Sequence, residues 1–209
     1  MTGSFSALLI ATITVAVVHS LAPDHWLPFV MIGKAQGWSK SKLAVITMLS
    51  GIAHVGSSVI LGSVGILLGI AAIHLKGVEA VRGHIGILLL IGFGVGYAIW
   101  GFRRSRTHRH RSLDLSTKKV VTLWTLFAVF VLGPCEPLIP LMFLATSYGE
   151  FGVILVTVIF TIATLLMMAG QALLGSLGVQ IIKHHAADQY SHAFAGLVVA
   201  LTGIFLLVV

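Results

Sequence analysis

The stretch "HSLAPDHWLP", residues 19 to 28, decides the fold, because it places two histidines, an aspartate and two prolines inside a long apolar segment. Proline removes a backbone donor and clashes with the preceding turn, so a helix that crosses this stretch is expected to break there. An ionised carboxylate within a bilayer is costly, by at least ~2.5 kcal/mol. The stretch therefore predicts a broken helix with a functional polar site at the break.

A matching interruption occurs in the second half of the chain. "LGPCEPLIP", residues 132 to 140, repeats the order of a leucine, a small residue, a proline, two polar residues and further proline. Such interruptions in corresponding positions of two halves are typical of transporters whose binding site lies between inverted repeats. All five prolines of the chain fall in these two stretches: Pro23, Pro28, Pro134, Pro137 and Pro140.

The composition is that of an integral membrane protein. The 209 residues are 57% hydrophobic and only 9% charged, whereas about a quarter of the residues in a soluble protein are charged. Continuous apolar runs without strand alternation favour helices over a barrel. Runs long enough for a ~30 Å hydrocarbon core cover residues 5–32, 43–75, 84–102, 120–148, 151–182 and 193–209.

These runs predict an all-α polytopic membrane bundle of six transmembrane helices. The segment lengths run long, long, short in each half, so we expect two inverted three-helix repeats with proline-broken first helices. The chain would form a single transmembrane domain over residues 1–209, with repeat 1 at about 1–102, a cytoplasmic basic linker at 103–119 and repeat 2 at about 120–209. No Lys or Arg precedes Lys34, so the first run is interpreted as a membrane segment rather than a cleaved signal peptide.

The distribution of basic residues predicts the orientation in the membrane. Eleven of the thirteen lie in the loops after the first, third and fifth runs, and only Lys76 and Arg82 lie on the other side. The positive-inside rule then places the protein in the cytoplasmic membrane with both termini outside the cytoplasm. We interpret the net charge of +7 as topology and contact with anionic lipid, and we expect no nucleic-acid partner. The glycine-rich face at residues 92–101 would suit a homodimer.

The predicted site combines imidazoles with a carboxylate. Its candidate metal ligands are His19, Asp24, His25 and His54, a donor set suited to Ni, Co, Zn or Fe(II). Five residues of straight helix would keep His19 and Asp24 on different faces, so a break at Pro23 is needed to bring them together. Candidate contributors from the second repeat are Cys135, Glu136, Thr164 and Gln171.

"HSLAPDH", residues 19 to 25, resembles the H-x-x-x-x-D-H signature of the nickel/cobalt transporter family (NiCoT/NicO), which has a further histidine in the next segment, as His54 is here. The whole chain resembles more weakly the plan of the LysE-like superfamily, which includes TauE-type sulfite exporters and DsbD/CcdA-type thiol transporters. The resemblance implies that His19, Asp24, His25 and His54 select the metal.

We therefore expect a secondary transporter of a divalent transition-metal cation, nickel or cobalt foremost, with a midplane His/Asp site. Histidine binds metal in its neutral form, so the transport is expected to be proton-coupled. The metal would be the substrate, with no permanently bound cofactor, and no enzyme motif is found in the sequence.

Two other functions stay open. Helix N-termini after Pro23 and Pro134 would suit a small anion such as sulfite, although no Lys or Arg falls within a predicted span. The second alternative is a redox or thiol-related membrane protein, or a metal-containing membrane enzyme. Cys135 is the only cysteine, and dithiol exchange needs two.

Overall fold

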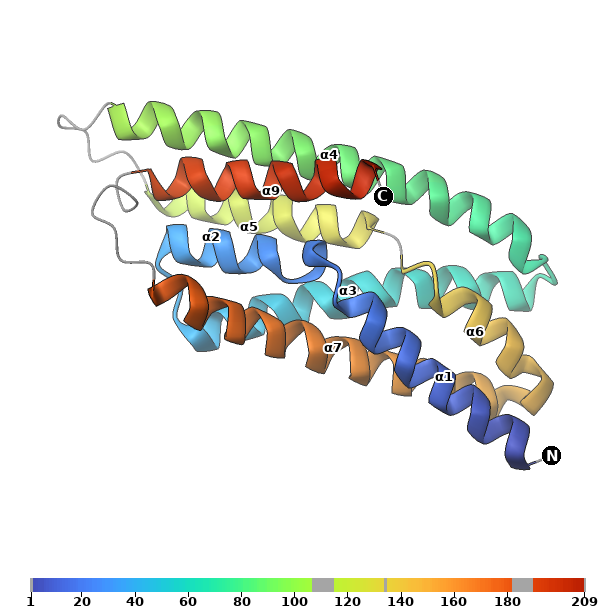
Figure 1. The fold of residues 1–209 in the computed structure, drawn as a ribbon. Coiled ribbons are helices and arrows are strands. Elements are labelled where there is room, and N and C mark those ends of the chain that lie inside the picture. The colour runs from blue at the N-terminus through green and yellow to red at the C-terminus, as the bar shows by residue number, and fades with distance from the viewer. Residues whose placement is uncertain (1, 107–114, 134, 182–189, 209) are drawn as a thin grey trace.

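The computed structural model describes residues 2–106, 115–133, 135–181 and 190–208, and within these ranges the chain is helical and contains no strand (Figure 1). Short 3-10 turns, η1 (Pro23–His25) and η2 (Thr146–Tyr148), stand beside longer helices. The all-α prediction is confirmed for this part of the chain. The α-helices are α1 (Thr2–Ser20), α2 (Leu27–Gln36), α3 (Lys40–Leu67), α4 (Ala72–Arg106), α5 (Leu115–Leu132), α6 (Leu138–Ala145), α7 (Gly149–Ile181) and α9 (Ser191–Val208).

Helices of this length and apolarity can cross a membrane. Four stretches of the described chain qualify, and the bent pair formed by α1 and α2 makes a fifth if it is one span. Large apolar side chains point outward along them, such as Ile60, Phe151 and Leu166, each at least 67% exposed. A surface of this kind is stable in lipid rather than in water. The four stretches are Lys40–Leu67, Ala72–Ser105, Leu138–Val179 and Ser191–Val208.

The first predicted helix break is present. α1 ends at Ser20, and the segments Ser4–Ser20 and Pro23–Gln36 are bent by 76°. Pro23 opens η1, and Pro28 lies in the first turn of α2, where the absent N–H costs no helical hydrogen bond. The break therefore follows directly from the two prolines.

The second break separates α5 from α6. α5 ends at Leu132, and Pro137 is the N-cap residue of α6. Pro140 lies in the first turn of α6, and Pro134 lies outside the described residues. Each proline stretch therefore lies between two helices, as the matched sequence patterns predicted.

The apolar run at 43–75 contains a turn that its hydropathy does not reveal. α3 ends at Leu67, and Gly69 adopts φ 66°, a left-handed conformation that glycine adopts without strain. α4 then begins at Ala72 and continues to Arg106, into the predicted basic linker. Of that linker, residues 107–114 lie outside the described chain, and α5 begins at Leu115. The turn was missed because its residues are as apolar as the helices that it joins.

Helix packing relies on glycine where backbones approach closely. α4 packs most extensively against α9, and α3 packs next most extensively against α7. A side chain on Gly94 would collide with the backbone N of Ala200, and one on Gly196 with that of Ala98. Small residues at such contacts allow membrane helices to associate closely. α4 and α9 run in opposite directions in Figure 1 and lie side by side over most of α9.

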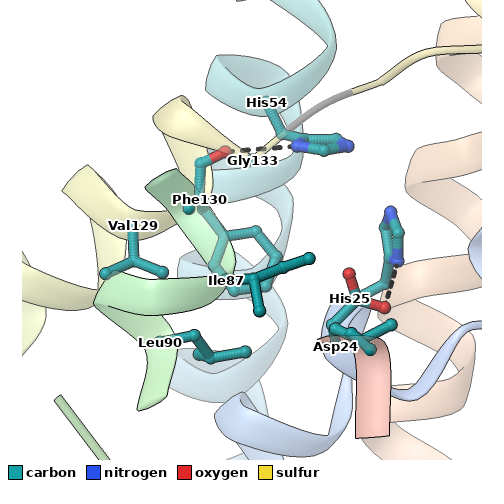
Figure 2. Close-up of a pocket in the computed structure, with 10 residues that line it drawn as sticks. Asp24, His25, His54, Ile87, Leu90, Val129, Phe130 and Gly133 are labelled. Atoms are coloured by element: carbon teal, nitrogen blue, oxygen red, sulfur yellow. Dashed lines mark hydrogen bonds and ion pairs between the residues drawn. The ribbon is translucent and has the colours of Figure 1, made fainter. Parts of the chain in front are cut away.

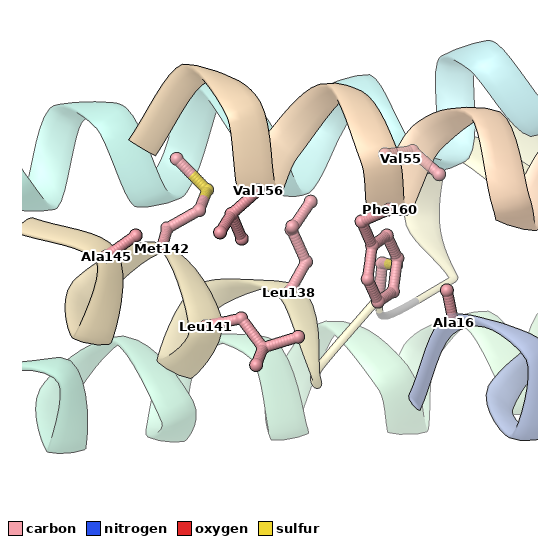
Figure 3. Close-up of a cluster of buried hydrophobic side chains, with 9 residues drawn as sticks. Ala16, Val55, Leu138, Leu141, Met142, Ala145, Val156 and Phe160 are labelled. Carbon is pink, nitrogen blue, oxygen red and sulfur yellow. The ribbon is translucent and has the colours of Figure 1, made fainter. Parts of the chain in front are cut away.

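A buried apolar cluster lies beside the two helix breaks. It joins α1, α3, α6 and α7 around Phe160, Leu138 and Met142 (Figure 3). Cys135, at the second break, belongs to the same cluster and is fully buried. The cluster therefore holds the second break, and the helix that follows it, in contact with α1.

Candidate metal centre

Three histidines converge where α1 ends. His19 comes from the last turn of α1, His25 from η1 and His54 from the middle of α3. One ring nitrogen from each lies within 4.8 Å of the other two. His25 and His54 are 2% and 3% exposed, and Figure 2 shows their rings turned toward a common space. The break at Pro23 permits this meeting, which a straight helix would prevent.

Asp24 orients the imidazole of His25. The Oδ1 atom of Asp24 lies 3.0 Å from Nδ1 of His25, and Nε2 of His25 lies 3.1 Å from Nε2 of His19. When Nδ1–H donates to the carboxylate, Nε2 carries the lone pair that faces His19. A carboxylate behind a histidine in this way is the usual support of a metal-binding imidazole. Asp24 therefore acts on the site through His25.

His54 is held in the same manner by the end of α5. Its Nδ1 donates to the backbone carbonyl of Phe130 at 3.1 Å, leaving Nε2 as the nitrogen with a lone pair. That Nε2 is buried and has no hydrogen-bond partner. A buried polar atom without a partner needs an explanation, because its desolvation is not compensated. A bound cation would supply the missing partner.

The three imidazoles are suitable metal ligands, and the distances between their ring nitrogens are close to those around one bound ion. Two nitrogens at about 2.0–2.1 Å from one tetrahedral ion lie about 3.4 Å apart. The His19–His25 separation of 3.1 Å is close to this value, whereas the 4.8 Å limit of the cluster is wider. A small movement of His54 toward the other two would complete three-nitrogen coordination.

The remaining sequence candidates occupy different positions. Cys135 Sγ lies 3.7 Å from His19 Nε2, while Glu136 is exposed. Thr164 is fully buried on α7 with no partner for Oγ1, and Nε2 of Gln171 is also buried without one. Gln171 is seven residues along the helix from Thr164, about 10 Å at 1.5 Å per residue.

A small cavity adjoins the cluster. It measures about 40 Å³, and its polar wall is formed by Asp24, His25 and His54 (Figure 2). A buried water needs roughly 10–15 Å³ of such volume, so the cavity is large enough for a few waters. Gly86 and Gly133 also line the cavity, and their backbones pack closely, because a Cβ on Gly86 would lie 3.2 Å from the Cα of Gly133. The other lining residues are apolar: Ile87, Leu90, Val129, Phe130 and Leu206.

The structure also shows a buried ion pair that sequence reasoning missed. Glu79, 1% exposed, lies 2.8 Å from the Nη2 atom of Arg82. The same Nη2 donates to Ser58 Oγ at 2.6 Å and to the carbonyl of Gly133 at 3.3 Å. Arg82 therefore links α3 and α4 to the second break. The i,i+3 spacing of Glu79 and Arg82 could have indicated an ion pair on one face of a helix. The predicted membrane run began only at residue 84, however, so both residues were assigned to a loop.

Comparison with known protein families found no matching family, and neither the curated proteins nor the solved structures contain a match.

Proposed function

We propose that this protein is a secondary transporter of a divalent transition-metal cation, with nickel and cobalt as the foremost candidates. The observation that carries the proposal is the convergence of His19, His25 and His54 at a helix break. His25 and His54 each bind an acceptor through Nδ1 and leave Nε2 for a ligand. This is the arrangement by which proteins prepare imidazole for a metal.

The electrostatics of the site favour a cation. α1 ends beside His19, and the last turn of α5 provides the carbonyl that contacts His54. Helix C-termini carry partial negative charge, and broken helices use them to bind cations. The carboxylate of Asp24 adds a full negative charge next to His25.

The sulfite alternative finds less support at this site. Arg82 lies inside α4, within a candidate span, although the sequence pattern placed no basic residue there. However, Glu79 pairs with Arg82 at 2.8 Å, so the positive charge of the guanidinium is already balanced by a carboxylate and the pair offers an anion no net charge. The redox alternative has only the one thiol of Cys135.

The proposal includes six passages through the cytoplasmic membrane. They would be α1 with α2, α3, α4, α5 with α6, α7 and α9, and Figure 1 shows consecutive members of this series running in opposite directions. The helix contacts support two inverted halves, because α3 packs on α7 and α4 on α9, which are the corresponding partners. α1 packs on α7 as α5 packs on α3. Alternating access would expose a site between the halves to one side at a time.

Proton coupling follows from the geometry of two facing nitrogens. Nε2 of His19 and Nε2 of His25 lie 3.1 Å apart, and two lone pairs do not face each other at that distance without a proton between them. A metal that binds both nitrogens must displace this proton. Metal and proton would then move in opposite directions across the membrane.

The test is uptake into proteoliposomes of purified full-length protein. We expect saturable flux of radioactive nickel or cobalt and none of sulfite. Replacing His25 with Ala should abolish the flux, whereas His84→Ala serves as the matched control, since His84 is an exposed histidine away from the cluster. Sulfite flux without metal flux would contradict the proposal.

A further inference from the structure

Cys135 lies beside one of the three histidines of the cluster. Its Sγ is 3.7 Å from Nε2 of His19, and the residue is fully buried. A sulfur at about 2.3 Å and a nitrogen at about 2.0–2.1 Å from one tetrahedral ion are about 3.6 Å apart. The separation in the structure therefore matches two atoms that share an ion.

An independent observation points to the same centre. Nε2 of His54, a side chain 3% exposed that belongs to the same cluster, lacks a hydrogen-bond partner. His19 itself has Nε2 in contact with both His25 and Cys135, at 3.1 and 3.7 Å. A single ion between these groups would satisfy the unpartnered nitrogen and the facing pair together.

We infer that Cys135 is the fourth ligand of the transported ion, giving a three-histidine, one-cysteine site for thiophilic borderline cations. This inference rests on the proposed function. The coordinating thiol loses its proton when the metal binds, so the thiolate partly offsets the charge of the ion. Thiolate with imidazole selects nickel, cobalt or zinc and disfavours magnesium, calcium and manganese, which prefer oxygen.

The position of Cys135 in the chain gives this ligand a further consequence. His19 and His25 flank the first break, whereas Cys135 lies at the second break, between α5 and α6. An ion bound to all three therefore connects the two breaks directly. Loss of the sulfur would leave the ion attached to α1, η1 and α3 alone, so coupling of binding to movement of α6 would weaken.

The experiment is absorption spectroscopy of the purified, detergent-solubilised full chain titrated with Co²⁺. A thiolate bound to cobalt gives a near-ultraviolet charge-transfer band that histidine ligands do not give. We expect this band in the wild type at one cobalt per chain. It should be absent from Cys135→Ser and from Cys135→Ala, with the visible bands of bound cobalt retained in both. The matched control is Met142→Leu, which removes another buried sulfur and should keep the band.

Each outcome decides one part of the account. Cobalt bound by the wild type without the charge-transfer band would overturn the cysteine ligand and leave the histidine site intact. A band that persists in Cys135→Ser would do the same. No cobalt bound at all by the monodisperse wild type would overturn the proposed function and the fourth ligand together. Because the wild-type band is itself decisive, the test does not depend on the variants folding.

Discussion

At the scale of single residues, the site depends on which nitrogen of each histidine is available. Nδ1 of His25 is held by Asp24 and Nδ1 of His54 by the carbonyl of Phe130. Both rings thereby present Nε2 to the cluster, and Nε2 of His54 has no hydrogen-bond partner within the described chain. The chemistry proposed for the site therefore depends on these two hydrogen bonds as much as on the ring nitrogens that face the cluster.

Replacing Asp24 with Asn tests the role of the carboxylate behind His25. The amide keeps the size of the side chain but removes the charge that raises the basicity of the ring. We expect metal affinity to fall about 10- to 100-fold, the usual effect of losing such a support. Equilibrium dialysis with nickel measures it, and Glu150→Gln, in the first turn of α7, is the control. An unchanged dissociation constant would remove Asp24 from the site.

The residues at the first break were predictable because proline and histidine are conspicuous in an apolar run. The supporting acceptor of His54 was not, since Phe130 acts through its backbone carbonyl, 76 residues away. Any residue can present a carbonyl, so no side-chain pattern identifies it. Glu136 shows the converse case: its place beside Cys135 in the sequence suggested the site, but the turn leaves it exposed.

At the scale of helices, glycine interfaces and the Glu79–Arg82 ion pair add to the apolar packing that holds the bundle. α4 takes part in both, through Gly94 against α9 and through Arg82 against α3 and the second break. The ion pair lies close to the histidine cluster, because Nη2 of Arg82 donates to the carbonyl of Gly133 and a Cβ placed on Gly133 would be 3.4 Å from Nδ1 of His54. Changes in α4 are therefore expected to affect stability and site geometry.

Gly94→Ala should separate α4 from α9. Its new methyl group would lie 2.8 Å from the Cα of Ala200 and from the carbonyl oxygen of Gly196, and backbone cannot yield as a side chain can. Overpacking of this kind costs about 1–3 kcal/mol. Thermal unfolding in detergent measures the loss. Gly92→Ala, on the same helix with nothing within 4 Å, should leave the midpoint unchanged, and equal effects of the two would contradict the close packing.

Arg82→Met should destabilise the protein strongly, because it leaves the Glu79 carboxylate buried and unpaired. Removing one partner of such a pair typically costs about 3–5 kcal/mol. The double variant Glu79→Leu with Arg82→Met removes both charges and should recover much of the stability. Denaturant unfolding compares the three proteins. A double variant no more stable than the single would show that the hydrogen bonds to Ser58 and Gly133, not the charge pair, carry the effect.

At the scale of the whole molecule, the helices pass back and forth along one direction (Figure 1). Large apolar side chains are exposed along them. Composition and apolar run length were enough to predict a helical membrane protein. They did not locate the turn at Gly69, because no polar residue or proline accompanies it. Helix ends made by glycine alone within apolar sequence leave no hydropathy signal.

The proposed orientation predicts opposite sides for the two short connections around α3. Lys40 and Lys42 lie near the connection before α3, which would be cytoplasmic, while residues 68–71 would face outside. A membrane-impermeant maleimide applied to intact cells should label Ala71→Cys and not Ser41→Cys, both exposed positions. The native Cys135 is fully buried, so we expect it not to react with the maleimide. Labelling of the Ser41→Cys variant alone would contradict the proposed orientation and indicate the opposite one.

The most direct test of the central claim, that three imidazoles form one metal site at the helix break, is the stoichiometry of nickel bound by the purified protein. We expect one nickel per chain for the wild type and for His84→Ala. We expect none for a variant in which His19, His25 and His54 are all replaced by Ala. A wild type that binds no nickel, or a triple variant that binds as much as the wild type, would contradict it.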